Sequence, residues 1–578
     1  MSGGDRIAKA LVRHGVRHLF TLCGGHISPI LVSAKQRGIS VIDVRHEATA
    51  VFAADAVSRL TGIPGVAAVT AGPGVTNTIT AIKNAQLAQS ALVLLGGATA
   101  TFLKGRGALQ DIDQMSLIKP HVKWAISVKT LREVVPAINR AFTEAKSGLP
   151  GPVFVELPVD LLYDEQLVRQ WYADAMGKGK ARGLGDKFVK WHLQRHVDKL
   201  FAGSEPVEDS APKEIERRFA DLAEVDQVLT RLKKAERPVL LIGSQAMLCA
   251  CEMYDVAAAV EKLGVPVYLA GMARGLLGEK NQLQAIHKRS QALNEADLVL
   301  LAGVPMDFRL NYGRAINRQA KLITVNLSRS DLKKNRRPTQ GIHADPGLFI
   351  IQLANQFPAD QKNWRDWVER LNQRGREREK EIEAFADQKT DRINPLRLCL
   401  EINQTMNRQS TVVVDGGDFV ATASYIVRPR GPFSWLDPGV FGTLGVGAGF
   451  ALGAKLVKPE SEVWLLYGDG SLGYGLAEFD TFVRHGLPVI AVVGNDAGWT
   501  QITREQVEIL EDDVGTTLQY TDYHRAAEGL GAVGLLLTEQ TSIRQVLQQA
   551  KELASAGMPV LINAHIGKTD FRKGSISM

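Results

Sequence analysis

Short apolar runs recur along the whole chain, and each ends in glycine, proline or other small residues. Segments with helical periodicity separate them. The runs fall into three groups: GVAAVT, ALVLLGG and GPVFVELP; RPVLLIGSQ, PVYLAG, ADLVLLAG and KLITVNL; STVVVDGGD, EVWLLYGDG, PVIAVVGND and PVLINAHIG. A strand that helices cover on both faces is apolar throughout, so this alternation is typical of parallel sheets built from βαβ units. We therefore predict an α/β protein with three doubly wound parallel-sheet domains.

Two charged stretches separate the three groups of strands and set the expected boundaries. A chain of 578 residues is also too long for one core, because a domain usually holds about 150 residues. The second charged stretch, 361–390, reads as a helical connector. We predict an N-terminal domain over 1–165, a linker over 166–225, a central domain over 226–365 and a C-terminal domain over 390–578.

The linker contains one segment that reads as an amphipathic helix, 187–201. In KFVKWHLQRHVDKLF, Val189, Leu193, Val197 and Leu200 share one helical face, among aromatic and basic residues. A basic amphipathic helix can lie on a membrane surface. Docking of this face onto the protein itself is the interpretation that we favour.

Composition argues against several classes of protein. The chain has 69 Lys and Arg and 62 Asp and Glu, and its net charge of +7 is not gathered into the dense basic clusters of a nucleic-acid-binding protein. Its four cysteines lack the number and spacing of a disulfide framework or zinc site, which favours a reducing compartment. No apolar stretch reaches the roughly 18 residues that span a bilayer, and the N-terminal segment has no signal core. We expect a soluble, cytoplasmic protein.

The strongest local motif lies in the last third of the chain. The segment EVWLLYGDGSLGYGLAEFDTF reads as an apolar strand ending in Gly468-Asp469-Gly470, and the strand in LPVIAVVGNDAGW ends in Asn495-Asp496. Glycines let the backbone approach a phosphate, and oxygen donors at adjacent strand ends suit a Mg²⁺ ion that bridges a diphosphate. A GDG triplet alone is more often a simple turn, so the second strand end is needed for this prediction.

A GDG triplet followed across a helix and a strand by paired asparagines resembles the motif of the thiamine diphosphate (ThDP)-dependent enzymes. This sequence departs from the pattern because Asp496 replaces the usual second asparagine. The additional negative charge should tighten the cation site. On this resemblance the metal ligands are Asp469, Asp496 and the carbonyl group of Gly498, with Asn495 as the alternative to Asp496, and the cofactor also contacts Gly470 and Ser471.

ThDP requires one protein carboxyl group at its pyrimidine ring, because its own 4′-imino group removes the reactive proton once N1′ is hydrogen-bonded to that group. The segment VIDVRHEATAVFAADAVSRLTGIPGVAAVTAGPGVTN places Glu47 after a strand and resembles the RHE…TAGPG pattern of the acetolactate synthase superfamily. Alone, Glu47 would be an acid favoured at a helix N-terminus. Combined with the GDG motif, it is predicted to be the catalytic glutamate of a pyrimidine-binding domain.

Two more segments match the superfamily in what would be its diphosphate-binding domain. In VFGTLGVGAGFALGAKL the resemblance implies that the Gly442 carbonyl receives the 4′-amino group, while Leu444 bends the cofactor into a V shape. A close-packed helix of small residues would explain these glycines equally well. In VVVDGGDF the resemblance implies that the diphosphate end is held by Gly417, Asp418 and Phe419.

Several strings resemble the acetolactate synthase-like 2-hydroxyacyl-CoA lyases, among them GGHISP, RGALQDIDQ, GGDFVATA and VGNDAGWTQITREQV. Those proteins cleave a 2-hydroxyacyl-CoA into formyl-CoA and a shortened aldehyde, and the reverse reaction is a carboligation. The membrane anchor of the vertebrate proteins is not expected here, so the chain resembles a soluble, bacterial relative. The resemblance implies ThDP and Mg²⁺ as cofactors, acyl-CoA and aldehyde as substrates, and active sites at the subunit interface of a homodimer or homotetramer.

The GxHI turn and the LQ pair imply His26 as the acid–base residue and Gln110 as its helper. Both are hydrogen-bonding groups that can accept a hydrogen bond or a proton from a substrate hydroxyl, or donate a hydrogen bond to it.

Benzaldehyde lyase, an acyloin lyase without CoA, shares these strings and remains an alternative. Acetolactate synthase is another, although GVPMDFRLNYGR replaces its flavin segment. Asn326 stands where many relatives place an acidic residue that holds a nucleotide ribose, which argues against an ADP activator. A non-catalytic scaffold is disfavoured because Glu47 and Asp469 are both present. Trp499 and the tail around Phe571 are expected near the pocket.

Overall fold

The computed structural model describes residues 2–175, 184–203, 213, 215–358 and 364–574, so parts of the predicted linker 166–225 lie outside the described residues. The chain divides into two compact units. The first comprises residues 1–58 and 63–216, and the second comprises residues 59–62 and 217–578.

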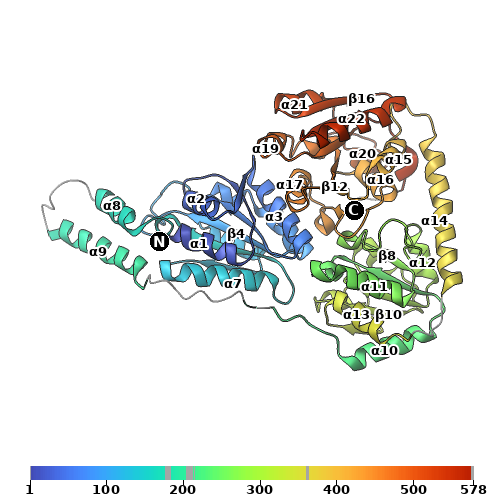
Figure 1. The fold of residues 1–578 in the computed structure, drawn as a ribbon, viewed down its shortest axis with the longest axis horizontal. Coiled ribbons are helices and arrows are strands. Elements are labelled where there is room, and N and C mark those ends of the chain that lie inside the picture. The colour runs from blue at the N-terminus through green and yellow to red at the C-terminus, as the bar shows by residue number, and fades with distance from the viewer. Residues whose placement is uncertain (1, 176–183, 204–212, 214, 359–363, 575–578) are drawn as a thin grey trace. The chain divides into compact units, whose positions relative to one another are not determined.

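Three sheets, in which all neighbouring strands are parallel, confirm the predicted fold class. Helices flank the strands of each sheet (Figure 1). In each sheet the chain first adds a strand on one side of the first strand and then adds the rest on the other side, as in doubly wound folds. Ligands of such folds bind at the carboxyl ends of the two strands between which this direction reverses. The reversals lie between β1 and β3, between β7 and β9, and between β12 and β14.

The first unit contains a sheet with the order β2-β1-β3-β4-β6-β5. Its strands are β1 (His18–Leu22), β2 (Ser40–Asp43), β3 (Gly65–Val69), β4 (Leu92–Ala98), β5 (Trp124–Ser127) and β6 (Pro152–Pro158). Its helices are α1 (Gly3–Arg13), α2 (Ser28–Gln36), α3 (Glu47–Thr61), α4 (Pro73–Thr76), α5 (Ile79–Ala88), α6 (Gln114–Ile118), α7 (Val134–Lys146), α8 (Glu165–Ala175) and α9 (Leu184–Phe201). Strands β3, β4 and β6 are buried along their whole length, which explains why they read as uninterrupted apolar runs.

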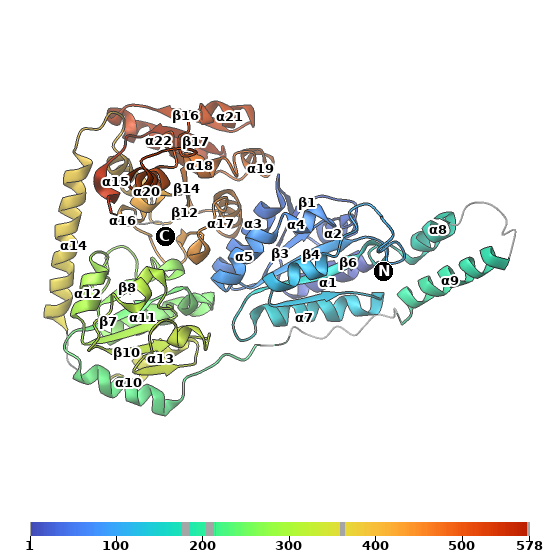
Figure 2. The ribbon, with the colours of Figure 1, turned by 180° about the vertical axis from the view of Figure 1, so that it is seen from behind.

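Helix α9 is the amphipathic helix that the linker sequence predicts, and it packs beside α8 (Figure 2). Its second half joins the core of the first unit through Val197, Leu200 and Phe201. The outer face of its first half remains open, because Phe188 is 65% and Trp191 is 52% exposed. Docking onto the protein itself is therefore confirmed for the second half only. Within the described part of the chain, no helix is both long enough and apolar enough to cross a membrane.

The second unit contains two sheets. The central one has the order β11-β10-β9-β7-β8. Its strands are β7 (Pro238–Ile242), β8 (Val267–Leu269), β9 (Leu298–Ala302), β10 (Lys321–Val325) and β11 (Gln340–Ile342), and its helices are α10 (Leu222–Lys234), α11 (Met253–Leu263), α12 (Arg289–Glu295) and α13 (Pro346–Gln356). The charged helix α14 (Arg365–Ala386) then leads to the last sheet (Figure 1).

The last sheet has the order β13-β12-β14-β15-β17-β16. Its strands are β12 (Thr411–Asp415), β13 (Trp435–Leu436), β14 (Val463–Gly468), β15 (Ile490–Asn495), β16 (Val533–Leu537) and β17 (Val560–His565). Its helices are α15 (Pro395–Thr405), α16 (Asp418–Ile426), α17 (Gly447–Val457), α18 (Asp469–Leu472), α19 (Glu478–Arg484), α20 (Thr500–Leu510), α21 (Tyr523–Gly529) and α22 (Ile543–Ser555).

Candidate active site

Glu47 is the first residue of α3 and is 5% exposed. The side-chain amide of Asn77, which follows α4, donates to its Oε2 at 3.0 Å. The loop after β2 therefore delivers a buried carboxyl group at the carboxyl edge of the first sheet, and the hydrogen bond from Asn77 fixes its orientation. A buried carboxyl group that is held in place can present its other oxygen to a ligand.

His26, Thr70 and Gln110 form a hydrogen-bonded chain beside the strand reversal of the same sheet. The turn after β1 carries His26, and Thr70 directly follows β3, the neighbour of β1. His26 Nδ1 lies 3.2 Å from Thr70 Oγ1, and the Thr70 hydroxyl donates to Gln110 Oε1 at 3.3 Å. The structure thus brings together the two residues that the sequence predicts, and it does so through a threonine.

This chain of hydrogen bonds sets the tautomer of His26. Since Thr70 has one hydroxyl hydrogen and gives it to Gln110, its oxygen accepts from a protonated Nδ1 of His26. Nε2 then carries the lone pair that can accept a proton. Burial lowers the pKa of His26, and the nearby Gln110 side chain opposes this effect, so the neutral imidazole predominates near neutral pH.

The backbone of this corner is held in a conformation that ordinary residues avoid. Gln110 has a φ of 62°, which is uncommon for a residue with a side chain. Gly72, in the Gly-Pro-Gly turn, has a φ of 59°, and a Cβ atom there would lie 2.8 Å from the Gln110 carbonyl oxygen. Gln114 links the same turn to β4, because it accepts from the Gly72 amide and donates to the Gly97 carbonyl. The glycine is therefore required for Gln110 to approach β3.

In the second unit, the carboxyl ends of β14 and β15 bring two acids together. Gly468 pairs with Gly494 across these strands, and Asp469 and Asp496 follow just beyond. The Gly498 amide donates to Asp469 Oδ2 at 3.1 Å, which joins the two loops. Asp469 is 3% and Asp496 is 9% exposed.

Both acids carry raised pKa values. Burial, with the charge of Asp496 added, raises the pKa of Asp469 to about 7. Burial also raises the pKa of Asp496 to about 6, although the nearby Thr500 hydroxyl opposes the shift. Two buried carboxylates that resist ionisation at one place are a donor set suited to a divalent cation, whose charge would favour their ionised form.

Asn495 faces the interior of the sheet. It is fully buried, and its amide nitrogen donates to Asn563 Oδ1 at 3.1 Å, while its Oδ1 accepts from the Ala497 amide. These bonds engage the side chain with the protein itself. Of the two residues left open as a metal ligand, Asp496 therefore fits a cation site better than Asn495.

The loop that carries Gly442 and Leu444 is anchored at the end of β12 by Asp415. This carboxyl group is fully buried and accepts from the Gly447 amide at 2.8 Å and from the Gly445 amide at 3.1 Å. Gly442 is exposed with a φ of 65°, and Leu444 is partly exposed. An apolar side chain is thus held beside the reversal between β12 and β14.

The remaining predicted residues surround the same sheet edge. Asp418, the first residue of α16, pairs with Arg504 at 2.8 Å, and the Phe419 ring occupies the space that a side chain at Gly494 would need. Gly417 precedes α16 as its cap. Ser471 is buried and its hydroxyl lies 2.5 Å from the Asp415 carbonyl oxygen, which holds β12 and β14 together.

Two aromatic residues expected near the pocket differ in their surroundings. The Trp499 ring lies against Gly470, where an added Cβ would be 2.5 Å from it. Phe571 is 9% exposed and packs edge-on against Phe385 and Tyr425. Phe571 is therefore part of the core of the second unit.

Sequence reasoning missed three residues of these arrangements: Thr70, Asn77 and Asp415. Asp415 was detectable, because it ends an apolar strand in the same way as Asp469 does. Asn77 follows the Gly-Pro-Gly turn, and Thr70 precedes it, but nothing in their spacing indicates which side chains they meet. In the central sheet, Asn326 accepts a hydrogen bond from Gln245 Nε2 at 2.9 Å and is 2% exposed, so its side chain stabilises the loops at the end of the sheet.

Comparison with known proteins agrees with this geometry. Residues 1–117 match the thiamine pyrophosphate enzyme N-terminal TPP binding domain, residues 225–353 match the central domain, and residues 415–564 match the C-terminal TPP binding domain. The chain therefore belongs to the thiamine diphosphate-dependent enzymes, and its cofactors are ThDP and Mg²⁺.

Within this family the chain is similar over its whole length to proteins named 2-hydroxyacyl-CoA lyase 2. It is 50% identical to that of Danio rerio, over 100% of this chain and 93% of the relative, and 49% identical to that of Homo sapiens, over 100% and 92%. A probable acetolactate synthase of Mycobacterium bovis is 33% identical over 97% of this chain and 95% of the relative. The resemblance to the acetolactate synthase superfamily is confirmed. Among these relatives, the lyases share more identical residues with this chain than the acetolactate synthase does.

Proposed function

We propose that the protein is a lyase that cleaves a 2-hydroxyacyl-CoA into formyl-CoA and an aldehyde one carbon shorter. The C1–C2 bond breaks, the hydroxyl oxygen on C2 loses its proton as C2 becomes the aldehyde carbon, and C1 gains a proton to become the formyl group. The full-length similarity to 2-hydroxyacyl-CoA lyase 2 supports the substrate class. The observation that carries the proposal is the chain of His26, Thr70 and Gln110, because this reaction needs a neutral acceptor for a hydroxyl proton.

His26 takes the 2-hydroxyl proton in this proposal. Its lowered pKa leaves Nε2 unprotonated near neutral pH, while Thr70 holds the ring through Nδ1. After cleavage the imidazolium can return the proton, which allows the same residue to serve the reverse carboligation. Gln110 keeps the Thr70 hydroxyl oriented and can donate its amide to a substrate oxygen.

The cofactor-holding roles divide between the two units. Glu47, oriented by Asn77, would hydrogen-bond the pyrimidine ring, and Asp469 and Asp496 would hold Mg²⁺, with the Gly498 carbonyl as a third ligand. ThDP, when bound, supplies a nucleophilic carbon and an electron sink. Leu444, whose loop Asp415 anchors, is the apolar side chain proposed to shape the cofactor, and Gly442 offers its carbonyl group.

The remaining predicted contacts concern the diphosphate. Gly470 and Ser471 at the start of α18 and Gly417, Asp418 and Phe419 at the start of α16 lie at the ends of neighbouring strands. Backbone amides at such positions bind phosphate oxygens well. Because the Ser471 hydroxyl is engaged with two carbonyl groups, we propose that its backbone amide contributes instead.

Product analysis tests the reaction. The enzyme, with ThDP and Mg²⁺, is incubated separately with a 2-hydroxyacyl-CoA, with pyruvate and with benzoin. Formyl-CoA and an aldehyde in equal amounts from the first, without turnover of the others, is the expected result. Acetolactate from pyruvate would favour the acetolactate synthase alternative, and benzaldehyde from benzoin would favour the acyloin lyase. Either result without formyl-CoA would refute the proposal.

We also propose that the enzyme is a homodimer or homotetramer in which Glu47 of one subunit and Asp469 of another serve the same cofactor. Mixing Glu47→Ala and Asp469→Ala subunits tests it. If sites are shared between chains, half of the dimers are hybrids and each has one intact site, so about one quarter of the wild-type activity returns. Sites contained within one chain would recover none.

A further inference from the structure

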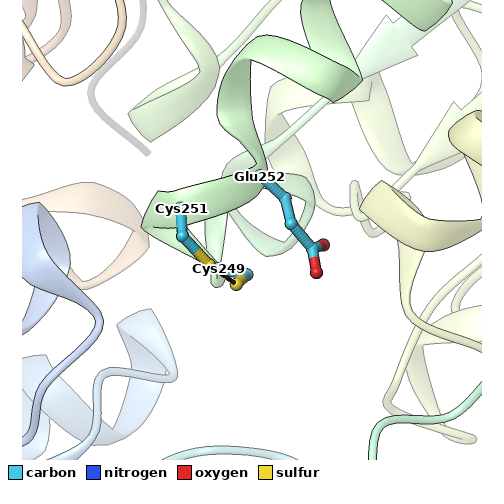
Figure 3. A group of neighbouring side chains, drawn as sticks. All are labelled: Cys249, Cys251 and Glu252. Carbon is cyan, nitrogen blue, oxygen red and sulfur yellow. Dashed lines mark hydrogen bonds between the residues drawn. The ribbon is translucent and has the colours of Figure 1, made fainter.

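A sulfur-rich turn in the central domain has no part in the proposed reaction. Cys249 and Cys251 flank Ala250 between the short helix at Ser244–Met247 and α11, and Glu252 directly precedes α11. The two Sγ atoms lie 2.8 Å apart. Both sulfur atoms and one carboxylate oxygen of Glu252 lie within 4.8 Å of one another, and the three side chains extend from the same turn (Figure 3).

The carboxylate of Glu252 is held in place by Arg217. This guanidinium pairs with Glu252 through Nη1, and its Nη2 lies 2.7 Å from Asp345 Oδ2. A basic group shared between two acids fixes the position of the Glu252 carboxylate, which lies within 4.8 Å of the sulfur atoms, as hydrogen-bonding partners behind metal ligands do. The same guanidinium offsets part of the negative charge that two thiolates and a carboxylate would gather.

A metal ion displaces the proton of a thiol and binds the thiolate directly, so two thiols as close together as these can serve as ligands of one ion.

We propose that Cys249, Cys251 and Glu252 bind a Zn²⁺ ion whose fourth ligand is water. Thiolate ligands select Zn²⁺ over Mg²⁺, and two sulfur atoms with one oxygen is a donor set that Zn²⁺ accepts in tetrahedral geometry. With bonds of about 2.3 Å the two sulfur atoms must move from 2.8 Å to about 3.8 Å apart. Cys251 is exposed and can make this adjustment by rotation about its side-chain bond, and its exposure also gives the ion access.

The spacing of the cysteines did not predict this site, because the four cysteines do not have the spacing of a common zinc-binding motif. A carboxylate supplies the third ligand here. The site is distinct from the Mg²⁺ site, since its residues belong to the central domain and prefer a different ion.

Zinc content of four matched proteins tests the proposal. Wild type, Cys249→Ser, Cys251→Ser and Cys23→Ser are purified with ThDP and Mg²⁺, reduced, and dialysed at one buffered concentration of free Zn²⁺. Cys23 is also an exposed thiol but lies in the first unit, so it is the control. We expect one more equivalent of zinc in wild type and Cys23→Ser than in the other two. Zn²⁺ that replaces Mg²⁺ would appear equally in all four.

Spectroscopy with Cd²⁺ gives an independent measure. Wild type should show a thiolate-to-metal charge-transfer band in the ultraviolet that each of Cys249→Ser and Cys251→Ser reduces by half or more. Glu252→Gln should keep the band and weaken binding about tenfold. Equal zinc content in all four proteins, or a band that neither serine variant changes, would overturn the proposal. So would a disulfide between Cys249 and Cys251 that persists under reduction.

Discussion

Replacement of Asp496 by asparagine, the residue usual in the motif, should stabilise the apoprotein and weaken its response to Mg²⁺. The carboxyl group is 9% exposed, and burial raises its pKa to about 6, with a contribution from the charge of Asp418. Asparagine has nearly the same shape, but it has no charge to bury. The same substitution replaces a charged ligand of the proposed cation site by a neutral oxygen ligand.

The size of the effect follows from the pKa of Asp496. The difference between about 6 and the ordinary value of 3.8 corresponds to about 3 kcal/mol. Because the pKa is raised in the folded state, this stability is present at low pH and is lost as the pH rises from about 4 to above 6. At about pH 8 the loss is complete in the wild-type apoprotein, so the variant should gain up to about 3 kcal/mol in free energy of unfolding.

Denaturant unfolding at about pH 8 measures the change, first with a chelator and then with ThDP and Mg²⁺. A ligand at about 100 times its Kd adds about 2.7 kcal/mol to a protein that binds it only when folded. The wild type should show this gain, and Asp496→Asn should show a smaller gain at the same Mg²⁺ concentration, because a neutral oxygen ligand binds the cation more weakly than a carboxylate. Glu460→Gln, at an exposed position, should change neither value by more than about 0.5 kcal/mol. An apoprotein destabilised by Asp496→Asn, or a variant with the full response to Mg²⁺, would refute the reasoning.

Three other outcomes are expected. Thr70→Val should lower kcat by up to about 100-fold with little change in KM, because the ring of His26 loses its hydrogen bond, whereas Thr70→Ser should retain activity. Gly72→Ala should lower the free energy of unfolding by about 2 kcal/mol or more and should also lower kcat. The reason is that the φ of 59° is strained for alanine and that the new Cβ atom would meet the Gln110 carbonyl oxygen. A variant as stable and active as the wild type would contradict this. Burial lowers the pKa of His287 to about 4, so stability should fall by about 3 kcal/mol as the pH drops from about 6.5 to 4, and denaturation curves of His287→Gln should lack that dependence.

The strands could be predicted because burial on both faces leaves a direct mark on composition. β4 and β14 are apolar from end to end, and the acids and glycines that follow β14 stand where the carboxyl edge of the sheet must be. The GDG segment, Glu47 and His26 could be found in the same way, since each directly follows a strand or lies in the turn after one. Position along the chain is sufficient for residues of this kind.

Partners that meet only through the fold could not be predicted. Thr70 and Gln110 are forty residues apart and meet because β3 and the loop after β4 converge on one corner. Asn77 reaches Glu47 from a different helix, and its sequence context is an ordinary turn. Helix α9 shows the same limit, because an apolar face along the whole helix gives no sign that this face is covered from Leu193 onward and exposed at Val189.

Three strand ends of the last sheet carry the same kind of residue and use it differently. Asp415, Asp469 and Asp496 follow or end β12, β14 and β15, and burial raises the pKa of each. The carboxylate of Asp415 accepts hydrogen bonds from the backbone amides of Gly445 and Gly447, so groups of the protein itself bind its oxygens. Asp469 accepts two backbone amides, and the charge of the neighbouring Asp496 makes Asp469 harder to ionise. A Mg²⁺ ion bound here as proposed would offset the negative charge of Asp469 and Asp496, so the apoprotein would be the less stable state.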